Sequence, residues 1–308
     1  MTIAGRVLNV GLQLPEVERE VRWPEYLDIA RAAEDVGFDA LWLGDHLLYR
    51  FASGETRGPW EAWTMLSALA ASTTRIALGP LVAAAAFHAP AMLAKMAATV
   101  DEVSGGRLIL GLGAGWNETE FRGFGFPFDH RIDRFEEAFT IIRTLLRDGA
   151  IDFDGRYFSA RDCELLPRPA RPGGPPLMVG SVGPRMLRIT MPHVDAWNVW
   201  FSDTGNTPAG VPPLRKLVDE ACRDVGRDPA AVERTVAVLV RLPDGRGRIM
   251  GDYAQVRHRP LEGPSEVIAQ ELRSYAREGI GAVQLVLDPI DRRSVEALAP
   301  VLEGLRSG

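Results

Sequence analysis

Two hydrophobic periodicities alternate along the chain. Short apolar runs, many of them β-branched, are typical of buried strands, and most are followed by a longer amphipathic stretch that is typical of a helix. The apolar runs predict strands over 7–14, 40–43, 76–82, 108–112, 177–179, 196–200, 236–240 and 283–287. The amphipathic stretches predict helices over 24–36, 60–71, 90–103, 133–147, 212–225, 265–278 and 292–305, with a short helix after Gly183.

This alternation over 308 residues predicts an α/β fold, a (β/α)8 TIM barrel, as a single domain over residues 1–308. We interpret two longer segments, 113–130 and the loop 242–263, as insertions after strands four and seven. A hairpin with an Asp154-Gly155 turn is expected over 151–158. A doubly wound open sheet is the competing architecture, but it would leave a second domain, and no linker composition marks one.

Composition narrows the classes of function. The net charge is −6 and no basic stripe dominates, which argues against a nucleic-acid partner and leaves small organic molecules as partners. No apolar run approaches the roughly 20 residues that span a bilayer, and the chain start lacks the pattern of a signal peptide. Cys163 and Cys222 have no metal-ligand spacing. A disulfide stays open, but two isolated thiols favour a reducing cytoplasm.

The loops after the strands of a barrel converge on one face, so unusual residues at strand ends are candidates for chemistry. Asp45 and His46 follow the second strand. An imidazole exchanges a proton near neutral pH, and a neighbouring carboxylate can orient it or raise its pKa. A helix cap beside a rim histidine is the alternative. Because no further histidine or carboxylate lies at a metal-ligand spacing from this pair, no metal site is predicted.

Glycines mark the ends of two later strands. Around Gly113 they would let the backbone lie against a flat ring or a phosphate, although a tight strand exit explains them equally well. After the fifth strand, residues 180–183 lead into a helix that begins with Pro184. Free amides and the helix dipole there favour an anion, and the Ser181 hydroxyl adds a donor. An ordinary strand-to-helix turn is the alternative.

Three further features are ambiguous. The small residues 83–86 would leave room for a ring, or would simply pack. The 242–263 loop carries several basic residues that would meet an anionic coenzyme tail or only solvent. They are Arg246, Arg248, Arg257, His258 and Arg259. Trp60 and Trp63 are candidates for the substrate pocket or for the core.

These motifs together resemble the luciferase-like flavin monooxygenase superfamily, and above all its branch of deazaflavin (coenzyme F420)-dependent oxidoreductases. The most specific piece runs over 105–125 and includes Gly-Leu-Gly-Ala-Gly-Trp-Asn at 111–117. Supporting pieces are Asp45-His46 and the segments 87–90, 176–185 and 195–198. The resemblance covers nearly the whole chain.

The resemblance implies a coenzyme ring over the strand ends and, by analogy with relatives, a homodimer. Asp45 and His46 would contact the deazaflavin head group, with His46 near the hydride-transferring carbon. The Leu81–Val82 bond falls where the family often has a non-proline cis peptide behind the ring. Asn117 would hydrogen-bond the ring or its side chain. The phosphate would meet backbone amides of Gly180, Ser181, Val182 and Gly183.

Departures from the family pattern bear on the substrate. Ala114 stands where relatives that act on a sugar phosphate carry a glutamate, and Phe87 stands where many relatives have arginine. Gln13, at the end of the first strand, can donate or accept a hydrogen bond but cannot act as a base. Its place at the barrel rim makes it a candidate for coenzyme binding.

The predicted function is therefore hydride transfer between coenzyme F420 and a small organic substrate, with a proton supplied through His46. The alternative is an FMN-dependent monooxygenase that uses reduced flavin and O2, since both coenzymes share the ribityl phosphate. A flavin-binding protein without turnover is a third interpretation, which the Asp45–His46 pair disfavours.

Overall fold

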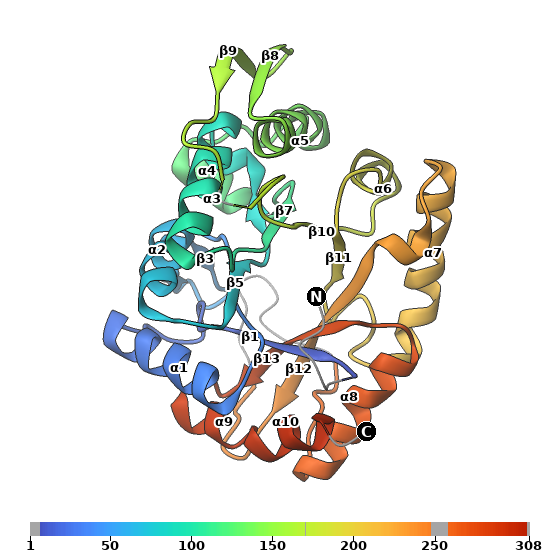
Figure 1. The fold of residues 1–308 in the computed structure, drawn as a ribbon. Helices are drawn as coiled ribbons and strands as arrows, with labels where there is room; N and C mark the ends of the chain where they lie inside the picture. The colour runs from blue at the N-terminus through green and yellow to red at the C-terminus, as the bar shows by residue number, and fades with distance from the viewer. Residues whose placement is uncertain (1–6, 170, 248–257, 307–308) are drawn as a thin grey trace.

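The computed structural model describes residues 7–169, 171–247 and 258–306, which form a barrel of parallel strands surrounded by helices (Figure 1). This confirms the predicted TIM-barrel fold. The barrel strands are β1 (Asn9–Gln13), β2 (Ala40–Leu43), β5 (Ala77–Pro80), β7 (Leu110–Gly113), β10 (Leu177–Gly180), β11 (Ala196–Val199), β12 (Glu233–Arg241) and β13 (Ala282–Asp288).

The sheet runs in the order β5-β2-β1-β13-β12-β11-β10-β7, with the short strand β6 (Ala83–Ala84) beyond β7. Its neighbouring strands pair in parallel. A parallel bridge between Leu78 and Leu108 closes the barrel, and the Ile109 amide donates to the Leu78 carbonyl at 2.9 Å. The strand predicted over 76–82 ends earlier, as β5, which pairs with β2, and the chain then forms the separate short strand β6, which pairs with β7.

Helices cover the outside of the barrel, and proline and glycine mark several of their ends. The first helix has a proline in its first turn and ends at Gly37 with a left-handed φ of 98°. The predicted last helix, 292–305, is broken in two, because Pro300 lacks the amide that a continuous helix would need there. The outer helices are α1 (Trp23–Val36), α2 (Ala62–Ser72), α3 (Pro90–Ser104), α5 (Arg131–Arg147), α6 (Pro184–Thr190), α7 (Val211–Asp224), α8 (Ser265–Arg277), α9 (Arg292–Glu296) and α10 (Ala299–Arg306).

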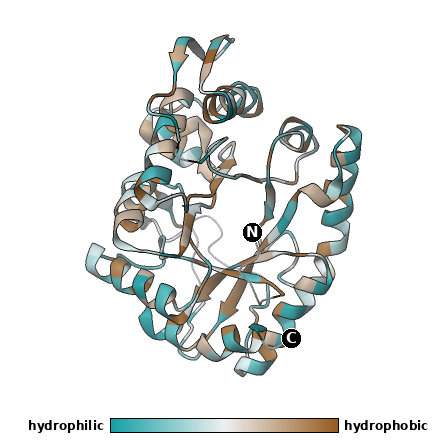
Figure 2. Cartoon of the chain, viewed as in Figure 1, coloured by the Kyte–Doolittle hydropathy of each residue, from teal (hydrophilic) through white to brown (hydrophobic). Residues whose placement is uncertain are grey.

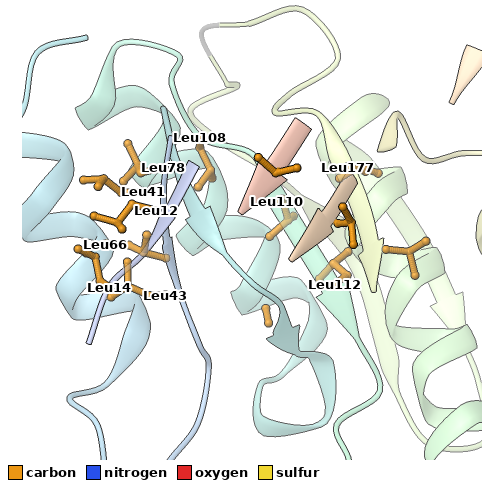
Figure 3. Packing of buried hydrophobic residues seen from close by; sticks show 14 of the residues in the cluster. Leu12, Leu14, Leu41, Leu43, Leu66, Leu78, Leu108, Leu110, Leu112 and Leu177 are labelled. Atoms are coloured by element: carbon orange, nitrogen blue, oxygen red, sulfur yellow. The ribbon is translucent and has the colours of Figure 1, made fainter. Parts of the chain in front are cut away.

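Side chains alternate between the helix layer and the barrel interior, as the two-residue period of a strand requires. Buried leucines such as Leu12, Leu41 and Leu110 belong to the large core that includes the helices, and Figure 3 shows Leu78 beside Leu108 where the barrel closes. The strands β12 and β13 are coloured mainly as hydrophobic in Figure 2, whereas α7 carries many hydrophilic residues. The fold therefore places a continuous apolar layer between sheet and helices.

Inside the barrel, the large Trp42 side chain packs against glycines of the neighbouring strands. The Trp42 indole occupies the space beside Gly11 and Gly79, where a Cβ atom would overlap it or touch it closely. A separate small cluster inside the barrel includes Trp42, Met178 and Ala196. At the carboxyl ends of the strands, the barrel interior opens into a cavity.

The connecting segments differ from expectation in several places. Within 113–130 the chain forms a helix, α4 (Glu118–Phe124), which the glycine- and phenylalanine-rich composition did not indicate. The hairpin is larger than predicted, with strands β8 (Ala150–Asp154) and β9 (Ser159–Glu164). Its turn is the loop 155–158, closed by the Gly155 amide and the Phe158 carbonyl at 2.9 Å, rather than a tight Asp-Gly turn.

A second small antiparallel pair, β3 (Tyr49–Arg50) and β4 (Thr56–Arg57), follows β2. In the loop after β12, Arg248 and Arg257 lie outside the described residues. Cys163 and Cys222 are both free thiols. Within the described ranges, no helix combines the length and apolarity needed to cross a membrane.

Candidate active site

A cavity of about 960 Å³ opens where the carboxyl ends of the barrel strands meet. Its size suits a cofactor-sized ligand. Most of the residues predicted to form the site lie in its wall: Gln13, Asp45, His46, Leu81, Val82, Gly180, Ser181, Val182 and Gly183. The wall also contains Glu16, Tyr49, Trp116, Glu120 and Arg131, to which the sequence assigned no role in the site.

His46 is held by a carboxylate that lies far away in the sequence. Its Nδ1 atom is 3.0 Å from Oε2 and 3.2 Å from Oε1 of Glu120, a residue of α4 that is 1% exposed. On the other side of the ring, Nε2 lies 3.9 Å from Oε1 of Glu16. Of the two roles expected for Asp45, Glu120 instead orients the imidazole, whereas the negative charge of Asp45 does raise the pKa of His46.

The surroundings of His46 favour its charged form. Burial lowers the pKa of the imidazole, but the hydrogen bond to Glu120 and the negative charges of Glu16, Glu120 and Asp45 outweigh it, so the pKa is raised. A histidine of this kind keeps its proton at a higher pH than a free imidazole does. It can therefore serve as a proton donor to a ligand in the cavity.

Asp45 instead fixes the chain that follows β5. Its Oδ2 atom accepts a hydrogen bond from the Ala84 amide at 2.9 Å and lies 2.9 Å from Nε2 of His88. The Asp45 side chain is almost fully buried, which makes these contacts stronger than they would be in water. The carboxylate thereby anchors β6 at Ala84, two residues beyond Val82.

The bond between Leu81 and Val82 is a cis peptide, as the family resemblance implied. The methyl groups of Val82 fill the space that glycines leave. A Cβ atom on Gly111 or Gly113 would lie 2.8 Å from a Val82 methyl group, and one on Gly180 would lie 3.2 Å from another. The sequence left two interpretations of the glycines around Gly113, close approach to a ring or phosphate and a tight strand exit. In the structure they accommodate Val82, as does Gly180, and the Val82 side chain forms part of the cavity wall.

Residues 180–183 line the cavity and lead into α6, as predicted. The loop satisfies part of its own hydrogen bonding, because the Gly183 amide donates to the Ser181 hydroxyl at 3.1 Å. The Ser181 carbonyl accepts from the Trp197 indole at 2.7 Å. The Gly183 amide is thus already engaged, which leaves fewer donors for an anion than the sequence suggested.

A fixed cation lies at the neighbouring start of α5. The Arg131 guanidinium donates to the Gly115 carbonyl at 2.6 Å and lies 4.3 Å from the centroid of the Phe128 ring. Helices α5 and α6 are joined by an ion pair between Arg185 and Glu136 at 2.9 Å. Arg131 therefore adds a positive charge on the side of the cavity that holds residues 180–183.

The opposite corner of the cavity contains an acceptor without a partner. Gln13 donates through Nε2 to Oε2 of Glu16 at 2.8 Å, and the Tyr49 hydroxyl donates to Oε1 of Glu16 at 2.6 Å. The Gln13 Oε1 atom is buried and has no hydrogen-bond partner within the part of the chain that the structure describes. An unmet buried acceptor costs about 1–3 kcal/mol, so a ligand with an N–H or O–H group would be favoured here.

The chain matches the family model of luciferase-like monooxygenases over residues 8–286. It belongs to the luciferase-like monooxygenase family. It is 34% identical over 170 residues to 5,10-methylenetetrahydromethanopterin reductase of Archaeoglobus fulgidus, covering 55% of this chain and 47% of the relative. With pyrimidine monooxygenase RutA of Cronobacter sakazakii it shares 33% identity over 173 residues, 54% of this chain and 50% of the relative. The matched part spans about half the length of these curated relatives.

Solved structures show the same fold. An F420-dependent secondary alcohol dehydrogenase in complex with an F420–acetone adduct superposes with a TM-score of 0.80 at 20% identity, covering 97% of this chain and 99% of that one. The oxygenating component of 3,6-diketocamphane monooxygenase from Pseudomonas putida, in complex with FMN, gives 0.70 at 17% identity, covering 95% and 97%. One of these two structures thus contains an F420 adduct and the other contains FMN.

One predicted site residue of this member of the luciferase-like monooxygenase family lies outside the cavity wall. Asn117 caps α4, where its Oδ1 accepts from the Thr119 amide at 3.3 Å and its Nδ2 donates to the Leu48 carbonyl at 3.1 Å. Both ends of this amide are therefore used within the protein. The two tryptophans also lie outside the wall: Trp63 is buried, and the Trp60 indole donates to the Val21 carbonyl at 2.8 Å.

The sequence did contain a signal for Glu120. An asparagine followed by acidic residues is typical of a helix start, and Asn117 precedes Glu118 and Glu120 in the first turn of α4. Recognising that helix would have placed Glu120 near the barrel rim. Nothing comparable marks Glu16 or Tyr49, which meet His46 only through folding. Among the described residues, no group of His, Cys, Asp and Glu side chains is placed to hold a metal ion.

Proposed function

We propose that the protein is an oxidoreductase that binds coenzyme F420 in this cavity and transfers a hydride to or from a small organic substrate. The observation that carries the proposal is that His46, held by Glu120, shares one cavity with the Val82 surface. A proton donor and an apolar platform for a flat ring thus face the same space. This combination suits hydride transfer coupled to proton transfer.

The residues present fit such a coenzyme. Val82 would support one face of the ring, while Arg131 and residues 180–183 would hold the phosphate. The unmet Gln13 acceptor would take an N–H or O–H group of the coenzyme or the substrate. When bound, F420 supplies a carbon that gives or accepts a hydride. The chain itself orients the ring, excludes water and holds a proton at His46 Nε2.

FMN-dependent monooxygenation is the second candidate. It is supported by the similarity to pyrimidine monooxygenase RutA and to the FMN-bound camphane monooxygenase component. FMN and F420 both carry a ribityl phosphate, so Arg131 and residues 180–183 would serve either coenzyme. The His46–Glu120 pair favours F420, because reduction or oxidation at a polar bond moves a proton together with the hydride.

Titration of the purified protein with F420 and, separately, with FMN tests the proposal, with ring fluorescence as the readout. We expect F420 to bind at least about tenfold more tightly, which corresponds to about 1.4 kcal/mol. Tight binding of FMN with none of F420 would overturn the choice of coenzyme. A His46→Ala variant should keep F420 binding and lose about 10²–10⁴-fold in turnover. Full turnover in that variant would exclude His46 from the mechanism.

A further inference from the structure

We infer that Glu120 is a positioning residue that holds His46 through Nδ1 and so presents Nε2 to the substrate. The inference deepens the proposed function and rests on it. No contact between Glu120 and a ligand is required, because the carboxylate acts through the imidazole. The case depends on what Glu120 binds, on what lies beside Nε2, and on what else could orient the ring.

Glu120 forms hydrogen bonds both to the His46 ring and to the backbone that follows His46. Its Oε1 atom accepts from the amides of Leu47, at 2.6 Å, and Leu48, at 3.2 Å, the residues that follow His46. Its Oε2 atom lies 3.0 Å from Nδ1 of His46. A buried carboxylate with these donors is held in one orientation. Because α4 supplies Glu120, the ring position depends on a helix outside the loop that carries His46.

The Nε2 side of the ring is open to a ligand. The distance of 3.9 Å to Glu16 Oε1 is too long for a hydrogen bond. Glu16 cannot easily close this gap, because Tyr49 and Gln13 hold its oxygens at 2.6 and 2.8 Å. A ligand oxygen at about 2.8 Å from both Nε2 and Glu16 Oε1 would bridge the two groups. A hydroxyl there would donate to Glu16 and accept from a protonated Nε2.

Neighbouring rings restrict rotation of the imidazole. The Tyr49 ring centroid lies 4.9 Å from that of His46, and the Trp116 ring lies edge-on at 5.6 Å. Asp45 binds other groups instead of the His46 ring, since its Oδ2 contacts the Ala84 amide and His88. The ring is therefore clamped by side chains from β3, α4 and the segment before α4.

The charge and tautomer of His46 follow from this arrangement. The titratable groups that face it are Glu16 after β1, Asp45 beside it, Tyr49 on β3 and Glu120 on α4. Since Nδ1 meets a carboxylate, the neutral ring carries its proton on Nδ1 and leaves the Nε2 lone pair toward the ligand. The charged ring offers an Nε2 proton instead. Glu120 thus makes the same nitrogen both the acid and the base.

NMR of the coenzyme-free protein labelled with ¹⁵N-histidine tests this inference. In the wild type, the neutral ring of His46 should be protonated at Nδ1. In Glu120→Gln the titration midpoint of His46 should fall by about one pH unit or more, because one facing charge is removed. Glu120→Asp should restore part of the shift, and Glu118→Gln, an exposed neighbour on α4, should leave it unchanged.

The inference would be overturned by an Nε2-protonated neutral ring in the wild type, a measurement that needs no variant. It would equally be overturned by a midpoint in Glu120→Gln within about 0.3 pH unit of the wild type. A positive NMR result without F420 binding would leave the positioning role standing and remove the proposed function, so the two failures are distinguishable. Once a turnover assay is established, the pH profile of kcat/KM in Glu120→Gln should shift in the same direction as the titration midpoint of His46.

Discussion

Adding a methyl group at Gly113 tests whether glycines make room for Val82. An alanine Cβ there would lie 2.8 Å from Cγ2 of Val82, and the other neighbour within 4 Å in the described structure is the Gly180 carbonyl oxygen at 3.9 Å. The backbone at Gly113 lies outside the left-handed region, so alanine adds no strain of its own. The clash is therefore confined to one methyl group of one side chain.

The magnitude follows from that single contact. Overpacking a well-filled site costs about 1–3 kcal/mol, so Gly113→Ala should lower the free energy of unfolding by that amount. Val82→Ala removes two methyl groups from a half-buried side chain and should cost roughly 1 kcal/mol at about 0.8 kcal/mol per buried CH2. The Val82→Ala change also removes Cγ2, the atom with which the new Cβ at position 113 would clash. The double variant should therefore be about 1–2 kcal/mol more stable than the sum of the single effects predicts.

Urea unfolding of the wild type, both single variants and the double variant measures this coupling. Gly111→Ala is the matched control, because its Cβ would overlap the Pro80 carbonyl oxygen as well as Val82, and removing the Val82 methyls cannot relieve that overlap. Additive effects at Gly113 and Val82, within about 0.5 kcal/mol, would refute the reasoning. Equal rescue of Gly111→Ala would refute it too.

Further predictions concern charge. Arg131→Gln should weaken FMN binding about tenfold, because a charge-assisted hydrogen bond to the phosphate contributes at least about 1.5 kcal/mol. Binding of riboflavin, which lacks the phosphate, should be unchanged. Equal losses of affinity for both ligands would contradict this prediction. Asp45→Asn should lower the free energy of unfolding by about 1–2 kcal/mol in urea titrations, since one of its bonds is lost; an unchanged midpoint would exclude an anchoring role. Because the folded-state pKa of His46 is raised, its stabilisation is complete below about pH 6.5 and is lost as pH rises through that pKa. The stability gap to His46→Asn should narrow over that range, and a widening gap would contradict the sign.

The sequence determined the barrel and the location of its site. Alternating short apolar runs and amphipathic stretches are local patterns, and a parallel sheet buries such runs on both faces. The carboxyl ends of parallel strands meet at one rim, so Gln13, His46, Val82 and Gly180 were bound to converge once the strands were recognised. Chain order alone was enough for this inference.

Only the tertiary structure decided which side chains pair within the site. Asp45 adjoins His46 in sequence yet binds His88, and Glu120, 74 residues away, holds the imidazole. Gly113, which suggested close contact between the backbone and a ring, makes space for the Val82 side chain instead. Such pairings depend on how α4 and β6 pack against the rim of the barrel. Hydrogen bonds and packing depend on distance in space and not on separation along the chain. A local pattern of residues therefore does not indicate which side chains pair.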